Sequence, residues 1–399
     1  MKYNYVRHPS RLVTLMATYG GGSRVEGTKY PQGIAHFMEH VRFKGTNKYT
    51  AQELLKKVAY YGGSWNAFTS QDLVNFYIKI PVENVEKGFE YLSEIIWNPT
   101  FPQKELDKEK EVVCQEVRMY EDDVHDLTYY SILGNVFSNS LKKKIVGTEE
   151  SVRSITREHL LEFNKEIYDR DNMLITLVGP EDEAALVSKY FGTPDGKLNF
   201  KPAEKTVDYA LSFLKEFEKS GHIQNTIMVA FGSQELHSTI KQDLPTARVF
   251  NSIFGGNDDS RLFLNVRENM GLVYGIGSDV DDMFDGTLFM INTLTEPENT
   301  NKVLEVVDSE ISKMLEAPPT DEEFNRAKNR IKSYIYASLE SSYGNAMRSI
   351  LQEFAGYDNV DAFLEKVNAV TKEQVHNFAK KVFSANKYVS VCKGVGDKS

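Results

Sequence analysis

Two histidines and a glutamate lie within one short segment, His36-Phe37-Met38-Glu39-His40. Residues four positions apart share one face of an α-helix, so the imidazoles of His36 and His40 can reach one metal ion. Glu39 follows His36 by three positions and therefore leans toward the same space. The order H-x-x-E-H is typical of metal sites that activate water for hydrolysis, with the carboxylate as proton acceptor.

The alternative interpretation is that His36 and His40 only form the polar face of an ordinary helix. The residues that would line the rest of this helix are apolar: Ala35, Phe37, Met38 and Val41. A mostly buried helix would then carry only the polar groups of the motif inward. Because buried polar groups without partners are costly, the pattern favours a bound metal as their partner.

A catalytic zinc usually has three protein ligands, and the motif supplies two of them. The third can come from a predicted helix at residues 102–120, which is rich in glutamate. Helical periodicity places Glu109 and Glu116 on one side of this helix, two turns apart. We interpret Glu111 and Glu121 as solvated residues. Periodicity by itself leaves Glu109 and Glu116 as equal candidates for the third ligand.

The composition is that of an ordinary globular protein, with 41% hydrophobic and 26% charged residues among 399. This length predicts two domains. The net charge of −10 argues against nucleic acid and anionic membranes as partners, because both require a basic surface. Cys114 and Cys392 are the only cysteines, too few for a disulfide framework or a cysteine zinc site.

The N-terminus has no apolar signal-peptide core, and no run of about 18 apolar residues occurs in the sequence. We therefore expect a soluble, cytoplasmic protein without membrane contact, unless a targeting segment has been removed.

Residue patterns predict alternating strands and helices in the first half. Residues 11–19 are apolar and β-branched and end at three glycines, which is typical of a strand. A pair of strands is expected at 65–70 and 74–80. Besides the motif helix, helices are expected at 52–61, 82–97 and 102–120.

The two halves of the sequence resemble each other. Residues 155–179 align without gaps to residues 370–394 at an offset of 215, and both segments indicate a helix and then a strand that ends in glycine. Residues 16–20 resemble residues 228–232 at an offset of 212. A period this long indicates duplicated domains. We predict the following division: a first domain at 1–195, a linker at 196–210 and a second domain at 211–399.

The duplication also predicts that only the first domain binds metal. At the offset of 212, the positions of the three motif residues hold Arg248, Asn251 and Ser252 in the second half. These residues do not form a metal-ligand set, so we expect one metal ion per chain.

The motifs together resemble those of the pitrilysin/insulysin-type zinc peptidases, in which H-x-x-E-H is the inverzincin signature. In that family a glutamate follows the motif by roughly 75 residues. Here Glu116 follows His40 by 76 positions. The resemblance therefore implies that Glu116 is the third ligand and that Glu109 is a supporting carboxylate. The mitochondrial processing peptidases and many bacterial homologues belong to the same family.

The resemblance extends into the second half of the chain. Residues 260–274 resemble the family's C-terminal motif, whose arginine and tyrosine correspond to Arg267 and Tyr274. By this resemblance the pair binds substrate carbonyls or stabilises the oxyanion. The segment that holds Asn66 and Ala67 resembles the strand beside the family's zinc site, and a peptide substrate is expected to add to its edge.

Two features depart from the family pattern. The segment before the first clear strand is short, so the family's first strand is either truncated or replaced by residues 2–6. In addition, Val41-Arg42 replaces the apolar pair that often follows the second histidine.

The resemblance implies an α+β fold of two tandem, structurally similar domains, each a largely antiparallel sheet with helices packed on one side. It implies one half-shell of a two-part chamber, so we expect a homodimer. The implied function is a zinc-dependent endopeptidase that hydrolyses peptides or unfolded segments inside the chamber. His36, His40 and Glu116 would hold one Zn²⁺ per chain, and Glu39 would be the general base.

Two alternatives stay open. The chain could be a non-catalytic structural or assembly subunit of the same fold, although the intact motif set favours an enzyme. It could also be the zinc-bearing subunit of a heterodimeric processing peptidase. The presence of the zinc motif together with Arg267 and Tyr274 on one chain favours the homodimer.

Overall fold

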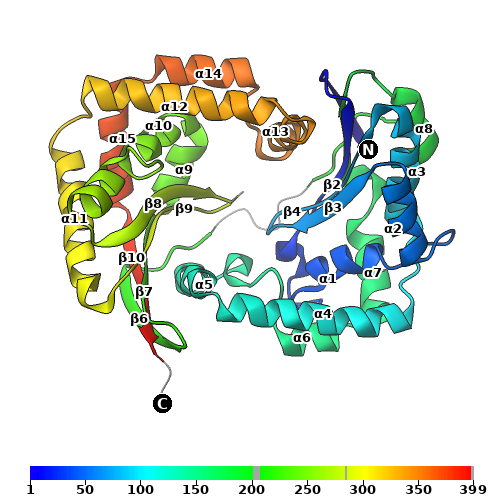
Figure 1. Cartoon of the computed structure of the whole chain (residues 1–399), viewed down its shortest axis with the longest axis horizontal. Coiled ribbons are helices and arrows are strands. Elements are labelled where there is room, and N and C mark those ends of the chain that lie inside the picture. The colour runs from blue at the N-terminus through cyan, green and yellow to red at the C-terminus, as the bar shows by residue number, and fades with distance from the viewer. Residues whose placement is uncertain (201–206, 284, 397–399) are drawn as a thin grey trace. The chain divides into compact units, whose positions relative to one another are not determined.

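The computed structural model describes residues 1–200, 207–283 and 285–396. The chain forms two compact units, each built around one five-stranded sheet (Figure 1). The first unit comprises Met1–Met119, Lys143–Ala203 and Tyr336–Tyr357, and the second comprises Tyr120–Lys142, Glu204–Ile335 and Asp358–Ser399. Part of the predicted linker at 196–210 lies outside the described residues.

The strands of the first unit are β1 (Lys2–Arg7), β2 (Leu12–Gly20), β3 (Ser64–Thr69), β4 (Leu73–Pro81) and β5 (Met173–Gly179). Its helices are α1 (Ile34–Arg42), α2 (Ala51–Tyr60), α3 (Val85–Trp97), α4 (Gln103–Asp122), α6 (Glu149–Ser154), α7 (Arg157–Ile167), α8 (Ala184–Phe191) and α13 (Ser342–Ala355). The strands and helices predicted in this half all form, within a few residues of the predicted bounds.

The strands of the second unit are β6 (Phe213–Ser220), β7 (Asn225–Gly232), β8 (Val273–Asp282), β9 (Thr287–Thr295) and β10 (Asn386–Val395). Its helices are α5 (Val124–Val136), α9 (Gln234–Gln242), α10 (Leu244–Phe254), α11 (Thr300–Glu316), α12 (Asp321–Leu339), α14 (Val360–Ala369) and α15 (Lys372–Ser384). A π-helical turn, η5 (Phe263–Asn269), precedes β8.

The two sheets have the same topology. The first has the order β1-β5-β2-β4-β3 and the second the order β6-β10-β7-β9-β8, so each strand has a counterpart in the other sheet. In both sheets one edge strand runs parallel to its neighbour and the other pairings are antiparallel. The predicted α+β fold with two similar, largely antiparallel domains is confirmed.

The repeat predicted from the sequence is visible in matching helix starts. Thr156 and Thr371, which occupy equivalent positions in the aligned segments, each cap the helix that follows with a reciprocal pair of side-chain and backbone hydrogen bonds. These helices, α7 and α15, each lead into the strand that lies second in its sheet. The same local sequence therefore produces the same supersecondary unit twice.

The first strand is present rather than truncated. β1 pairs in parallel with β5, with Lys2 opposite Leu174 and Arg7 opposite Gly179. Residues 2–6 thus form the strand at one edge of the first sheet.

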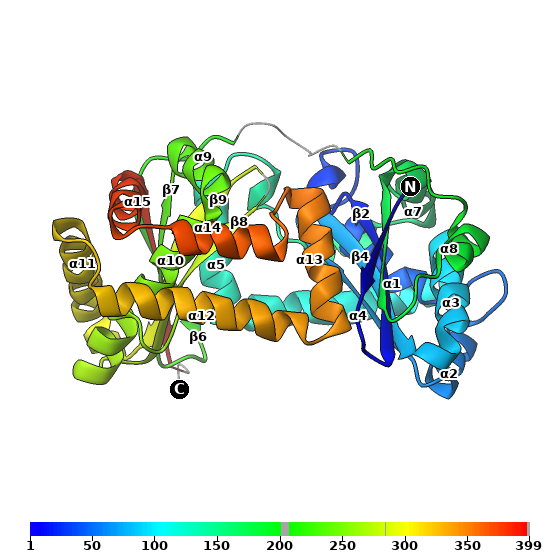
Figure 2. The same cartoon turned by 90° about the horizontal axis from the view of Figure 1, so that it is seen from above.

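Each sheet also receives one helix from a segment that the predicted division at 196–210 assigns to the other domain. α13 covers the second face of the first sheet, where Ser342 bonds to Thr14 at 2.8 Å and Glu353 pairs with Lys2 at 2.6 Å (Figure 2). α5 covers the second face of the other sheet, where Ser131 bonds to Ser390 at 3.0 Å. The units therefore do not follow chain order in residues 120–142 and 336–357.

The burial of β2 explains why α13 packs against the first sheet. In β2 the inward and outward side chains are both inaccessible: Leu15 and Ala17 on one face, Thr14 and Thr18 on the other. A strand buried on both faces needs cover from both sides, and α13 supplies the second layer.

In the part of the chain that the structure describes, no helix has the length and apolar character needed to cross a membrane.

Candidate functional site

The start of the motif helix α1 is held by its backbone. Gly33, directly before α1, has a φ of +88°, and a side chain there would meet the carbonyl oxygen of Val146 at 2.7 Å. The buried carboxyl group of Glu26 accepts hydrogen bonds from the backbone N–H groups of Gly33 and Ala35, both at 3.0 Å. These bonds satisfy unpaired N–H donors of the first helical turn, and the positive end of the helix dipole favours the ionised form of the carboxyl group.

The end of α1 is held by Arg42, which is fully buried. Its guanidinium donates to the carbonyl oxygens of Ile95 and Ile96 at 3.0 and 2.8 Å and lies 3.7 Å from the ring centroid of Tyr168. The two carbonyls belong to the last turn of α3, where carbonyl groups lack intrahelical partners. The departure from the family pattern at this position therefore gives α1 a polar anchor to its neighbours.

His36, His40 and Glu116 come together between α1 and α4. One ligand atom from each of the three lies within 4.8 Å of the others. His36 Nε2 is 3.6 Å from Glu116 Oε1, and His40 Nε2 is 3.4 Å from Glu116 Oε2. The side chains come from two helices far apart in the sequence, and the predicted spacing places both histidines on the inner face of α1.

These distances fit a metal ion better than direct hydrogen bonds. Nitrogen and oxygen ligands lie about 2.0–2.2 Å from zinc, so two of them at a tetrahedral ion are roughly 3.4 Å apart. Direct N–H···O bonds are shorter, about 2.7–3.2 Å. The side chain of His36 is buried, and its Nε2 is the ring nitrogen that faces Glu116. The donor set of two imidazoles and one carboxylate is also one that zinc prefers.

Glu109 lies beside this cluster but faces other partners. Its Oε1 is 2.9 Å from His40 Nδ1, and its Oε2 is 2.7 Å from Lys44 Nζ. Glu111, by contrast, pairs with Arg153 on the exposed side of α4. Of the two candidates for the third ligand, Glu116 therefore reaches both histidines, whereas Glu109 bonds to the outer nitrogen of one.

The two histidines differ in their tendency to hold a proton. Burial lowers the pKa of His36 to about 4, and the neighbouring His40 acts in the same direction. Burial would also lower the pKa of His40, but its interactions with Glu109 and Glu116 outweigh burial and raise it to about 9. Metal ligation requires neutral imidazole, so binding would release a proton from His40 at neutral pH.

Glu39 is the carboxylate of the cluster that is easiest to protonate. Burial raises its pKa, and the hydrogen bond that Thr69 Oγ1 donates to its Oε2 at 2.6 Å opposes this only in part. The pKa of Glu116 is instead lowered, chiefly by His40. A carboxyl with a raised pKa beside a metal site is suited to accept and return a proton.

Asn66 and Ala67 lie on β3, the edge strand of the first sheet next to β4. They pair with Tyr77 and Phe76 of β4, and β3 has no strand partner on its other side among the described residues. The same strand ends at Thr69, the residue that binds Glu39. An unpaired edge of this kind can accept an extended peptide as an additional strand.

Arg267 and Tyr274 lie together in the second unit. Arg267 Nε donates to the carbonyl oxygen of Tyr274 at 2.8 Å, and the guanidinium carbon lies 4.7 Å from the ring centroid of Phe263. The side chain of Tyr274 is 90% exposed. The guanidinium of Arg267 is also paired with the carboxylate of Glu268, and the phenol of Tyr274 lies at the surface of this unit.

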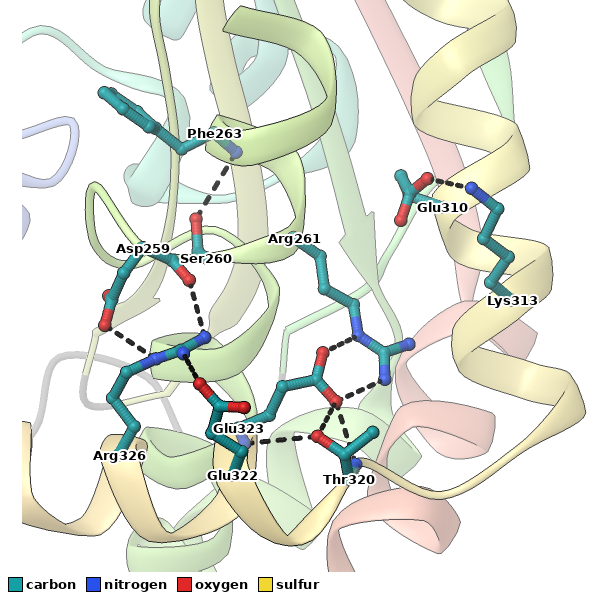
Figure 3. A network of polar contacts seen from close by, with 10 residues as sticks. All are labelled: Asp259, Ser260, Arg261, Phe263, Glu310, Lys313, Thr320, Glu322, Glu323 and Arg326. Carbon is teal, nitrogen blue, oxygen red and sulfur yellow. Dashed lines mark hydrogen bonds and ion pairs between the residues drawn. The ribbon is translucent and has the colours of Figure 1, made fainter. Parts of the chain in front are cut away.

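Ion pairs with α12 fix the segment that leads into η5 (Figure 3). Arg261 and Glu323 form two parallel contacts of 2.7 and 3.0 Å, and Arg326 pairs with Asp259 at 2.8 Å. Burial would raise the pKa of Glu323, but Arg261 and the start of α12 lower it to about 2. These contacts hold the beginning of the turn that carries Arg267.

The positions in the second unit that correspond to the motif are occupied by residues that form hydrogen bonds and an ion pair with other side chains. Asn251 accepts a hydrogen bond from Ser278 at 2.7 Å, and Asn257 donates to Ser252 at 2.8 Å. Arg248 lies 3.4 Å from Asp279. Amides and hydroxyls that satisfy one another replace the metal-ligand set here.

One further group of possible ligands occurs in the second unit. Asp123, His125 and Asp126 also place ligand atoms within 4.8 Å of one another. Asp123 caps α5 by accepting from the backbone N–H groups of His125 and Asp126, and the group lies at the surface. We interpret it as a helix cap.

Sequence comparison gives the family of the chain. Residues 6–149 match the profile described as "Insulinase (Peptidase family M16)", and residues 154–331 match that of the "Peptidase M16 inactive domain". The chain belongs to peptidase family M16. A relative from Bacillus subtilis, named "Uncharacterized zinc protease YmxG", is 30% identical over 94% of this chain and 91% of its own length. Another "Uncharacterized zinc protease", from Rickettsia felis, is 30% identical over 91% and 88%.

Solved structures related to family M16 share the fold. A "peptidase M16 inactive domain" from Pseudomonas fluorescens superposes with a TM-score of 0.86 at 20% identity, over 100% of this chain and 96% of that one. A protease from Helicobacter pylori superposes with a TM-score of 0.86 at 18% identity, over 98% and 96%. This likeness extends over both units.

Thr69 and Lys44 also contact residues of this site, and no sequence pattern singles them out. Thr69 and Lys44 were visible only as members of a strand and of the segment after the motif helix. Neither residue type signals chemistry by itself. A hint exists for Thr69, because β-strand alternation places it on the same face as Ala67, but its bond to Glu39 depends on how β3 packs against α1.

Proposed function

We propose that this chain is a zinc-dependent endopeptidase. The observation that carries the proposal is the cluster of His36, His40 and Glu116, with ligand atoms within 4.8 Å of one another and Glu39 beside them. Membership of family M16 and relatives named zinc proteases support the same activity. One Zn²⁺ per chain is proposed, because the equivalent positions of the second unit hold no such ligand set.

Zinc at this site would polarise the scissile carbonyl and increase the acidity of a water molecule. Glu39 would take the proton of the attacking water and return it to the leaving amine. Thr69 donates to Oε2 of Glu39 and so orients the carboxylate for transfer at Oε1. Glu109 would hold His40 by its outer nitrogen, which leaves Nε2 for the metal.

The substrate proposed is a peptide or an unfolded segment. The unpaired edge of β3 at Asn66 and Ala67 can bind an extended backbone, and such binding depends little on side-chain identity. Arg267 and Tyr274 are proposed to bind substrate carbonyls or to stabilise the oxyanion, an effect that can reach about two to three orders of magnitude in rate. We also propose that the active species is a homodimer.

The test combines metal analysis with peptide cleavage. Purified wild-type protein should carry about one zinc per chain, and Glu116→Gln should lose zinc affinity more than Glu109→Gln does. Glu39→Gln should keep zinc and peptide binding while turnover falls by about two to four orders of magnitude. Near-normal turnover in a zinc-loaded Glu39→Gln protein would exclude Glu39 as the base, and His40→Ala with full zinc would place the metal elsewhere.

A further inference from the structure

Lys44 forms an ion pair with Glu109 on the side of the carboxylate that does not face His40. It lies just beyond the end of α1, where its backbone N–H donates to the carbonyl oxygen of Val41 at 3.1 Å. Its ammonium group is 2.7 Å from Glu109 Oε2, and the other oxygen of Glu109 is 2.9 Å from His40 Nδ1. Both oxygens of the buried Glu109 carboxylate therefore have a partner, one in His40 and the other in Lys44, which lie four positions apart.

This arrangement determines what Glu109 can do. An anionic carboxylate bound at both oxygens is held in one rotamer and has neither oxygen free to turn toward the metal cluster. It can then act as the hydrogen-bond acceptor that orients His40. Without a cation at Oε2, the freed oxygen could swing toward any bound ion, and His40 would lose its fixed partner.

We propose that Lys44 is a positioning residue of the metal centre, which holds Glu109 as the support of His40 and keeps it from becoming a metal ligand. This inference rests on the proposed function. It explains why two glutamates on the same face of α4 have different roles: Lys44 binds Glu109, and only Glu116 is left to complete the set with His36 and His40. The contact also joins the end of α1 to α4, the two helices that carry the proposed ligands.

A merely structural ion pair is the competing explanation, and the chain contains a matched control for it. Lys48 lies in the same segment and pairs with the buried Glu94 at 2.9 Å. Its side chain is more exposed than that of Lys44, 61% against 29%. Lys48→Met changes the net charge as Lys44→Met does, but it acts on Glu94, which is not a member of the cluster of His36, His40 and Glu116.

The experiment measures zinc affinity by competition with a chromogenic chelator, using the full chain at neutral pH. Lys44→Met should weaken zinc binding by about 10- to 100-fold, the range typical of lost outer-shell contacts. Lys44→Arg keeps the charge and should weaken binding less than Lys44→Met does. Lys48→Met should bind zinc like the wild type. Thermal unfolding of the metal-free proteins shows whether each variant is folded.

A double mutant separates positioning from general destabilisation. If Lys44 acts through Glu109, Lys44→Met should cause little further loss of zinc affinity in a Glu109→Gln background. If the fold-losses in zinc affinity of Lys44→Met and Glu109→Gln multiply in the double mutant, the proposal is overturned. Equal zinc affinities of Lys44→Met and Lys48→Met would overturn it as well. A wild-type protein that binds no zinc would overturn both this inference and the proposed function. Zinc binding by the wild type with an unaffected Lys44→Met would overturn this inference alone.

Discussion

At the scale of single residues, Glu26 shows how burial and hydrogen bonding compete around the motif helix. Its carboxyl group is completely buried, which raises its pKa to about 8 from an ordinary value of 4.5. The backbone donors of Gly33 and Ala35 and the charge of Lys143 favour the ionised form but do not outweigh burial. The start of α1 is therefore sensitive to the protonation of one residue that has no part in the proposed chemistry.

The sign of the resulting pH dependence follows from linkage. Between about pH 4.5 and 8 the folded protein holds a proton on Glu26 that the unfolded chain has released. The free energy of unfolding therefore falls as the pH rises through this window and levels off above it. Because Gln cannot titrate, the stability of wild type relative to Glu26→Gln should decline from about pH 5 to about pH 8. Urea unfolding of metal-free protein at several pH values measures this difference, and a constant difference would contradict the prediction.

At the scale of elements, the position of α1 depends on a close approach between backbones. Gly33 has a positive φ, and a Cβ atom there would lie 2.7 Å from the carbonyl oxygen of Val146 and 3.0 Å from the Cα atom of Gly147. Neither atom belongs to a flexible side chain that could move aside. The glycine before the motif is therefore required by conformation and by space.

Gly33→Ala should destabilise the protein by at least about 1 kcal/mol, because alanine disfavours this φ and the added methyl group meets backbone atoms. Zinc affinity should fall as well, because α1 carries His36 and His40. Gly134→Ala is the matched control: this glycine lies in α5, and a Cβ atom there meets nothing within 4 Å beyond the nearby backbone of its own helix. The control should be stabilised by roughly 0.5–1 kcal/mol. Urea unfolding compares the two variants, and a Gly33→Ala protein as stable as wild type would show that the backbone adapts.

At the scale of the whole molecule, the proposed homodimer leads to a complementation test. Suppose that each site combines the metal centre of one copy with Arg267 and Tyr274 of the other. Glu39→Gln then damages the half of a site that one copy supplies, and Tyr274→Phe damages the half that the other copy supplies. A mixed dimer then has one site with both defects and one with none. At equal mixing and random exchange, about a quarter of all sites should be intact. Peptide cleavage after subunit exchange measures the recovered activity.

Exchange must be shown separately, for example by capture of a tagged subunit with an untagged one. Complete exchange without recovered activity would show that sites are not shared between copies. A molecular mass in solution equal to that of one chain at all protein concentrations would contradict the homodimer itself.

Much of this molecule is determined by local sequence. The spacing of His36, Glu39 and His40 sets which side of α1 they share, because the helical period depends on the backbone alone. The capping threonines Thr156 and Thr371 mark equivalent helix starts for a similarly local reason. The offset between the halves predicted the duplicated fold and the loss of the ligand set in the second unit.

Tertiary structure decided what periodicity could not. Glu109 and Glu116 share one face of α4, and only the packing of α4 against α1 shows that Glu116 reaches both histidines while Lys44 holds Glu109. The exchange of α5 and α13 also depends on contacts between segments more than 200 positions apart, such as that of Thr14 with Ser342. Local sequence patterns determine which residues share a face of a helix or strand and where each element ends. Contacts between distant segments depend instead on how the whole chain packs and buries its side chains.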